Sequence, residues 1–289
     1  MEHFVEIAKA EEHQGVRIAS LYGLILPHQR CGWFRHNLAR KTERSIILVR
    51  LRIVCTRLSG EARPIPKEIE VKLKFESAAA ARKKLARIGA KPVPGEVAAK
   101  DGRYHERNIL FDTPDGGFAR HGQLLRVRIE STPTLGKKAA TRVLLTYKGP
   151  AEPSGEGRYK IRQENEVVVA DVSAITSILE ALGLRGWFRY EKFRTHFVLS
   201  SSKKWAAGLH LELDETPVGV FLELEGPPSA IDRAAGELGF SPRNYITKNY
   251  LLLHMEDCRR KGLSVPQLAP GIIAGIPDMV FPESLSKKR

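Results

Sequence analysis

The stretch that decides the fold is Glu68-Ile69-Glu70-Val71-Lys72-Leu73-Lys74-Phe75, in which charged and apolar residues alternate strictly. A period of two is that of a β-strand, so one face carries the charged side chains and the other the apolar ones. The two glutamates lie two positions apart and point the same way, close enough to share a divalent cation through oxygen ligands. An ordinary half-buried strand with a solvated charged face would show the same alternation.

The same alternation recurs down the chain, with turn residues between the stretches. Strands are predicted at 102–112, 124–130, 141–149, 158–169, 189–199, 208–215 and 219–226, and helices at 77–89, 171–183, 229–239 and 247–260. The order strand, helix, strand, strand, strand therefore occurs twice. Short strands joined by turns favour antiparallel pairing and a closed or nearly closed barrel.

The domain organisation follows from composition. Residues 1–66 are basic and show no sustained period, so we expect a poorly ordered N-terminal extension, the alternative being a basic arm for nucleic acid or membrane. Arg63-Pro64-Ile65-Pro66 is expected to link it to the first strand, because proline disfavours both helix and central strand. Residues 67–257 form the predicted domain, and 258–289 a proline-rich C-terminal tail that we expect to be loosely ordered.

The bulk composition narrows the class of protein. The chain has 289 residues and a formal net charge of +14, which favours a polyanionic partner such as nucleic acid, an acidic membrane or a phosphate-rich small molecule. Its three cysteines form no CxxC pattern, which argues against a disulfide framework or a zinc site and predicts a reducing, cytoplasmic location. No run approaches the roughly 18 apolar residues of a membrane span, and the acidic start argues against a signal peptide.

The charged faces of the predicted strands segregate by sign, which an indifferent solvated surface would not require. The acidic residues form the pairs Glu68/Glu70, Glu164/Glu166, Glu212/Asp214 and Glu223/Glu225. The basic residues form the clusters Arg126/Arg128, Arg158/Lys160/Arg162 and Lys192/Arg194. A barrel of about eight strands can hold one small ligand, and buried charges need partners. A polyphosphate with a divalent cation would provide both, so we expect these faces to point inward.

The Glu-x-Glu-x-Lys at Glu68, Glu70 and Lys72 resembles the signature of the CYTH superfamily, the triphosphate tunnel metalloenzymes. Its members include class IV adenylyl cyclases, thiamine triphosphatases and inorganic triphosphatases. The segments LLRVR, TYKG, EKFR, LELDE, FLELEG and TKNYL follow in the family's order, and the resemblance covers about residues 67–257. It implies an α+β fold, an eight-stranded antiparallel β-barrel (the tunnel) flanked by helices.

The resemblance also implies roles for individual residues. Metal ligands are expected at Glu68, Glu70, Glu212, Asp214, Glu223 and Glu225, and triphosphate-binding residues at Arg126, Arg128, Lys148, Arg162, Lys192, Arg194 and Lys248. Lys72 is expected to be catalytic, contacting phosphate or, with a pKa lowered by nearby cations, helping to activate water. Glu164 and Glu166 match an acidic pair that would bind a second metal or orient the bases. Arg158 and Lys160 receive no role.

These expectations describe an enzyme that uses Mg²⁺ or Mn²⁺ to act on a triphosphate such as ATP, thiamine triphosphate or tripolyphosphate. It would hydrolyse the terminal phosphate or cyclise ATP to cyclic AMP, and the motifs do not separate the two. A non-catalytic polyphosphate- or nucleotide-binding module would tolerate loss of the acidic residues, which are all present. A nucleic-acid-binding protein is disfavoured, because the sequence has no helix-turn-helix, aromatic stacking motif or zinc finger.

Overall fold

The computed structural model describes residues 67–133, 140–152, 157–265 and 275–282, together with the backbone of four strands nearer the N-terminus. The chain divides into two units, residues 1–63 and 64–289. In the first unit, β1 (His3–His13) pairs antiparallel with β2 (Val16–Leu26), and β3 (Lys41–Thr42) with β4 (Ser45–Ile46). The sequence pattern does not predict these strands. The rest of residues 1–66, and with it the predicted poor order, lies outside the described residues.

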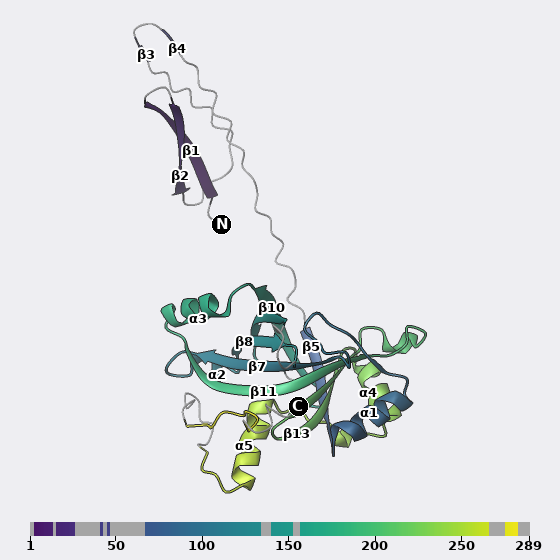
Figure 1. Ribbon diagram of the computed structural model, residues 1–289. Coiled ribbons are helices and arrows are strands. Elements are labelled where there is room, and N and C mark those ends of the chain that lie inside the picture. Colours follow the sequence, from purple (N-terminus) through teal and green to yellow (C-terminus); the bar gives the residue numbers. More distant parts are fainter. Residues whose placement is uncertain are drawn as a thin grey trace. The chain divides into compact units, whose positions relative to one another are not determined.

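The second unit is built on a barrel of eight antiparallel strands, as predicted (Figure 1). The sheet runs in the order β12-β13-β5-β10-β9-β8-β7-β11, and β11 pairs with β12 to close it. A short strand, β6 (Lys91–Pro92), adds to β11. The barrel strands are β5 (Lys67–Phe75), β7 (Arg103–Asp112), β8 (Leu124–Ser131), β9 (Thr141–Lys148), β10 (Lys160–Val169), β11 (Arg185–Val198), β12 (His210–Thr216) and β13 (Gly219–Glu225).

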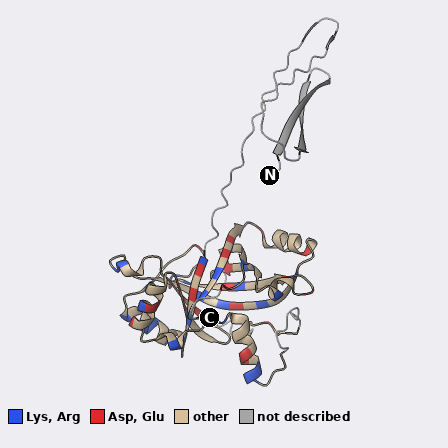
Figure 2. Ribbon diagram, turned by 180° about the vertical axis from the view of Figure 1, so that it is seen from behind, with Lys and Arg blue, Asp and Glu red and all other residues tan. Residues whose placement is uncertain are grey.

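Strand register brings the charged faces together inside the barrel. Lys72 of β5 lies opposite Glu223 of β13, and Glu70 lies opposite Glu225. Across the barrel, Lys192 of β11 lies opposite Glu106 of β7. Because side chains alternate across a strand, the odd-numbered residues of β5 point outward, and Val71 and Leu73 are fully buried beneath helices. The charged bands follow the barrel strands in Figure 2.

Helices cover two parts of the outer surface. Helices α1 (Ala78–Arg87) and α4 (Pro228–Glu237) pack on the apolar faces of β5, β12 and β13, and α3 (Val172–Ala181) packs on β8 and β9 (Figure 1). The predicted N-caps form, since the Ser77 hydroxyl accepts a hydrogen bond from the Ala80 amide at 3.1 Å and the Asp171 carboxylate caps α3. Shorter elements are α2 (Gly117–Arg120) and the 3₁₀ turns Lys204–Ala206 and Pro242–Asn244.

The last helix, α5 (Tyr250–Arg260), begins three residues later than the pattern predicts. The Asn249 side chain caps it by accepting a hydrogen bond from the Leu252 amide at 2.9 Å. Lys248 therefore lies before the helix, and its direction is set by the preceding loop. Among the described helices, none combines the length and the apolar character that a membrane crossing requires.

Part of the predicted C-terminal tail packs on the barrel. Within residues 275–282, Met279 forms a parallel bridge with Tyr190 of β11. The predicted loose order of residues 266–274 and 283–289 lies outside the described residues. The Glu191 amide donates to the Met279 carbonyl, and the Met279 amide to the Arg189 carbonyl, each at 2.9 Å. Ile276 and Met279 are buried in a cluster with α5. The prolines exclude helix here, but they leave these backbone groups free to pair with a strand.

We expect Met279→Ala to lower the free energy of unfolding by about 2–5 kcal/mol, because it removes a fully buried side chain from a packed cluster. Urea unfolding of the two proteins measures the difference. The neighbouring residue Val280 is 44% exposed, so Val280→Ala is the matched control and should change little. Equal stability of the two variants would show that the tail does not hold α5.

Candidate active site

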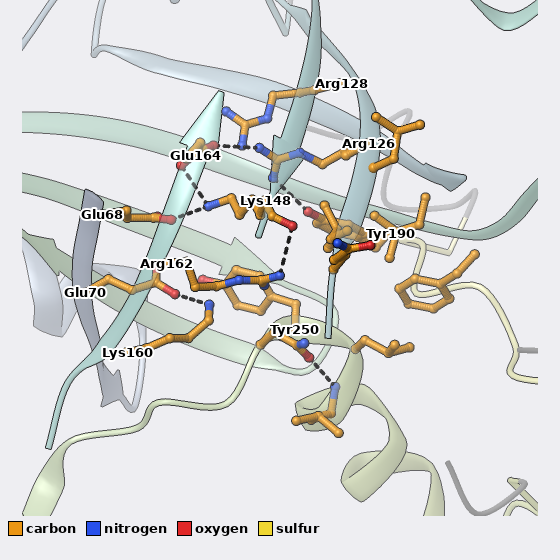
Figure 3. Close-up of a pocket in the computed structure, with 18 of the residues that line it drawn as sticks. Glu68, Glu70, Arg126, Arg128, Lys148, Lys160, Arg162, Glu164, Tyr190 and Tyr250 are labelled. Carbon is orange, nitrogen blue, oxygen red and sulfur yellow. Dashed lines mark hydrogen bonds and ion pairs between the residues drawn. The ribbon is translucent and has the colours of Figure 1, made fainter. Parts of the chain in front are cut away.

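The barrel interior is a cavity of about 580 Å³. Its charged lining comes from all eight barrel strands, and the labelled side chains of Figure 3 point toward one another across it. One end is lined by apolar side chains of β7, β8, β11 and the start of α5, among them Leu124 and Trp187. The charged lining residues are Glu68, Glu70, Lys72, Asp112, Arg120, Arg126, Arg128, Lys148, Lys160, Arg162, Glu164, Glu166, Lys192, Arg194, Glu212, Glu223 and Glu225.

On the wall formed by β5, β9 and β10, acids and bases alternate. The Lys148 ammonium lies 2.6 Å from the Glu68 carboxylate and 3.0 Å from that of Glu164. The Glu70 carboxylate accepts hydrogen bonds from Lys72, at 3.2 Å, and from Lys160. These are charge-assisted contacts in a buried site, so each side chain is held in place by at least one opposite charge.

The opposite part of the interior centres on Arg194 of β11. Its guanidinium forms a bidentate pair with Asp214, both hydrogen bonds measuring 2.7 Å. It also contacts Glu212 and Glu223. The Lys192 ammonium and the Tyr250 hydroxyl donate to the same Asp214 carboxylate, at 2.9 and 2.6 Å. Asp214 is thus saturated by donors and fully buried behind the cavity lining.

We call four cations of the lining the basic wall. They are Lys192 and Arg194 of β11 and Arg126 and Arg128 of β8. Arg126 donates to the Tyr190 hydroxyl at 3.1 Å and to the Thr146 hydroxyl at 3.2 Å, while Thr146 donates to Glu166 at 2.8 Å. Arg128 donates to the side-chain amide oxygen of Asn108 at 3.3 Å. Each arginine keeps guanidinium donors available toward the cavity that it lines. Planar guanidinium groups suit bidentate recognition of phosphate.

Electrostatics correct the prediction of a lowered pKa at Lys72. Burial by itself would lower the pKa of this ammonium, but Glu223 and Glu70 more than offset it, and the pKa lies above its ordinary value. Lys72 therefore carries its proton at neutral pH and can donate to an anion. The pKa of Lys160 is lowered instead, by burial first and then by Lys72 and Lys148 against the opposing effect of Glu70. Lys160 is thus the less firmly protonated lysine of this wall.

Glu225 is a carboxylate of the cavity lining on β13. Among the described residues it forms no ion pair, and it lies opposite Glu70 in the strand register, where like charges repel. Burial first, and then the Glu68 and Glu212 carboxylates, raise the pKa of Glu225 to about 8. A cation bound beside this group would remove that repulsion.

The carboxylates of the cavity can be compared with the ligands that a divalent metal ion takes in proteins. Within the described ranges no three Asp, Glu, His or Cys side chains form a ready-made metal cluster, because lysines and arginines stand between the carboxylates. The chemistry nevertheless fits a hard cation, since the site offers carboxylate oxygens and Mg²⁺ takes only one or two of them together with water and phosphate oxygens. Glu225, with the nearby Glu68 and Glu70, is the group that such a cation would complete.

Two predicted residues do not reach the cavity. Lys248 precedes α5, is about half exposed and pairs with Glu256 on the outside of the barrel. Asp214 lies behind the lining, as described above. Arg162 lines the cavity, but its guanidinium donates to the backbone carbonyls of Gly149, at 2.7 Å, and Gly122, at 2.8 Å. It therefore joins the backbone at Gly122 to the backbone at Gly149.

The sequence analysis assigned no site role to several residues that the structure places in or beside the cavity. Tyr190 and Lys160 share a face with predicted site residues of their own strands, so the period of two was a usable signal for both. Glu106 and Asn108 alternate in the same way on β7. Tyr250 lies in the quoted segment TKNYL, but the period of two gave no signal for it, because it comes from the start of a helix.

The fold and its interior define a charged-tunnel β-barrel. The family model of the CYTH domain matches residues 66–247, and the chain belongs to that family. No curated protein matches the chain. Among solved structures, the PH1819 protein from Pyrococcus horikoshii OT3 is 23% identical, with a TM-score of 0.51 over 66% of this chain and 99% of that one. HpAC1 from Hippeastrum, a candidate adenylyl cyclase with a dominant triphosphatase activity, is 20% identical, with a TM-score of 0.42 over 69% and 98%.

Proposed function

We propose that this protein is a divalent-metal-dependent triphosphatase that removes the terminal phosphate of a triphosphate bound in the barrel. The observation that carries the proposal is one cavity lined both by the cations Arg126, Arg128, Lys192 and Arg194 and, on β5 and β13, by the carboxylates of Glu68, Glu70 and Glu225. Membership of the CYTH family supports the same conclusion. A binding module would need the basic wall but not the buried acids, which are costly without a cation.

The side chains divide the work in this proposal. The arginines hold phosphate oxygens bidentately and fix the chain for in-line displacement. Lys72, protonated and placed 3.1 Å from Glu223 and 3.2 Å from Glu70, donates to an oxygen of the reacting phosphate. Bound Mg²⁺ or Mn²⁺, held by Glu225 with Glu68 and Glu70, would act as a Lewis acid on the phosphate oxygens. Hydrolysis needs only a water molecule in addition to these groups.

The test is a screen of the purified protein with tripolyphosphate, thiamine triphosphate and ATP, each with Mg²⁺ and with Mn²⁺. We expect metal-dependent release of orthophosphate, which colorimetric assay measures. Cyclic AMP and pyrophosphate from ATP would instead identify a cyclase. Tight binding of tripolyphosphate without turnover of any substrate would identify a binding module and contradict the proposal.

Glu225 supplies a pH-dependent prediction for the metal-free protein. Between its unfolded pKa of 4.5 and its folded pKa of about 8, only the folded state holds the proton, so this group makes stability fall as pH rises through that window. At pH 8 without divalent cations, Glu225→Gln should therefore need more urea to unfold than the unaltered protein. The gap should close toward pH 4.5.

Adding Mg²⁺ at pH 8 should narrow the same gap, because a ligand stabilises the state that binds it. Glu237→Gln, on the exposed end of α4, is the control and should respond to neither pH nor Mg²⁺ in this way. A gap that does not change with pH would show that the Glu225 carboxyl is not held in the predicted state.

A further inference from the structure

Two buried acids of the barrel, Glu106 and Glu130, neither line the cavity nor have a predicted role. Glu106, in the middle of β7, has a fully buried side chain. Three cations of the basic wall surround its carboxylate. The Lys192 ammonium lies at 3.4 Å, the Arg128 Nε at 3.5 Å and the Arg194 Nε at 3.6 Å. All three cations line the cavity, and Glu106 lies behind them.

The contacts of Glu106 are those of a shared counter-charge. Neither carboxylate oxygen forms a hydrogen bond within the described part of the chain, although buried carboxylates usually have such partners. Its register partner on β8 is a second acid, Glu130, which Arg142 holds at 2.8 Å. Leaving a buried charge without direct hydrogen bonds costs stability. The arrangement is tolerable only because three positive charges approach the same two oxygens.

We propose that Glu106 is a positioning residue that holds Arg128, Lys192 and Arg194 as one set behind the bound phosphates. These side chains come from two strands. Lys192 and Arg194 also share Asp214, and Glu106 is the anion that contacts all three. From behind the wall, Glu106 keeps their nitrogens 3.4–3.6 Å from its two carboxylate oxygens, while all three side chains line the cavity. The proposal rests on the proposed function, since it assigns these cations to the reacting phosphates.

Glu106→Gln separates positioning from binding. The change keeps the size of the side chain but adds one net positive charge to the wall, so tripolyphosphate should bind at least as tightly as before. The three cations lose their common anchor, and a displacement of about 1 Å can cost on the order of 10²-fold in rate. We therefore expect kcat to fall by about that factor while the dissociation constant for tripolyphosphate, measured by calorimetry, stays equal or decreases.

The matched control is Glu191→Gln. Glu191 lies next to Lys192 on the outward face of β11 and pairs with His105 at 3.5 Å, and we expect unaltered kcat and binding. Should the Gln variant fail to fold, Glu106→Asp retains the charge and retracts it by one methylene. The Asp variant should keep the binding constant and show an intermediate kcat. Unaltered kcat in the folded variant, or equal proportional losses of binding and turnover, would overturn the proposal.

A readout independent of turnover distinguishes this inference from the proposed function. The Nε–H signals of Arg128 and Arg194 can be followed by ¹⁵N NMR in the ligand-free protein. Positioning by Glu106 predicts that both signals shift and exchange faster with water in Glu106→Gln, but not in Glu191→Gln. Absence of that change would contradict the positioning role even in an active enzyme. Its presence in a protein that hydrolyses nothing would contradict only the proposed function.

Discussion

Arg194→Met should lower kcat by about 10²–10³-fold and reduce the free energy of unfolding by about 3–5 kcal/mol. Arg194 is buried at the centre of the basic wall, where it forms a bidentate pair with Asp214 and also contacts Glu212 and Glu223. Methionine keeps much of the apolar stem but leaves these carboxylates without their main counter-charge. Removing one partner of a buried ion pair costs more than the pair contributes, because the remaining charge is stranded.

The pH dependence identifies this cause. Burial would raise the pKa of Glu212, but Arg194 first and His196 next offset it and hold the pKa at about 2. In the unaltered protein this group stabilises the fold above pH 4.5, and the contribution is lost as pH falls toward 2. Without Arg194 burial prevails, the pKa rises, and the ionised acid destabilises the fold at neutral pH.

The stability difference between Arg194→Met and the unaltered protein should therefore be largest near pH 7 and shrink as pH falls toward 4.5, in urea titrations at several pH values. Arg233→Met serves as the control, because Arg233 is exposed on α4 and pairs with Glu237 at 3.5 Å. The control should unfold like the unaltered protein at each pH. A difference that stays constant with pH would mean that lost packing, and not stranded charge, is the cause.

The barrel could be predicted because the alternation that identifies each strand lies within that strand's own sequence. The alternation at residues 68–75 fixes both faces of β5, and the same rule located every other barrel strand to within a few residues. Sign segregation then predicted an inward charged face, since a solvated surface has no reason to sort its charges. Ser77 and Asp171 likewise predicted where two helices begin, because their side chains can cap the first turn of a helix.

The parts that could not be predicted depend on long-range packing. The tail pairs with β11 through Met279, and nothing near residue 279 signals a partner about ninety positions earlier. The one-turn shift of α5, set by the Asn249 cap, takes Lys248 out of the tunnel. Tyr250 enters the site for the same reason. Sequence periodicity finds which face a residue occupies, but not which element crosses the end of a barrel.

Glu106 shows a different limit. Its alternation with Asn108 was visible, but a single acid within a mixed strand carries no distinctive pattern. The proposed role of Glu106 follows only from the structure, in which the strand register places Lys192 beside it and β8 brings Arg128 to its carboxylate. The pKa of Lys72 is a similar case. The sequence places cations near it, yet the structure places Glu223 and Glu70 nearer, and the direction of the shift reverses.

The double change Glu68→Gln with Glu70→Gln should lower metal-dependent turnover by about 10³-fold or more, because Lewis-acid stabilisation supplies several kcal/mol and each 1.36 kcal/mol is tenfold in rate. Gln keeps the shape of both side chains but removes two negative charges that favour a divalent cation. Affinity for Mn²⁺, measured by electron paramagnetic resonance, should fall in parallel. Turnover and Mn²⁺ affinity together test the metal assignment directly.

The folded state should survive this double change, for a reason visible in the ion pairs. Lys148 loses Glu68 but keeps Glu164 at 3.0 Å, and Lys72 loses Glu70 but keeps Glu223 at 3.1 Å. Lys160 loses its carboxylate, but its pKa is already lowered by burial, so it can become neutral at modest cost. Glu76→Gln, at the exposed residue that follows β5, is the control. Unchanged turnover in a folded double variant would remove Glu68 and Glu70 from the catalytic site and leave these carboxylates without their proposed role.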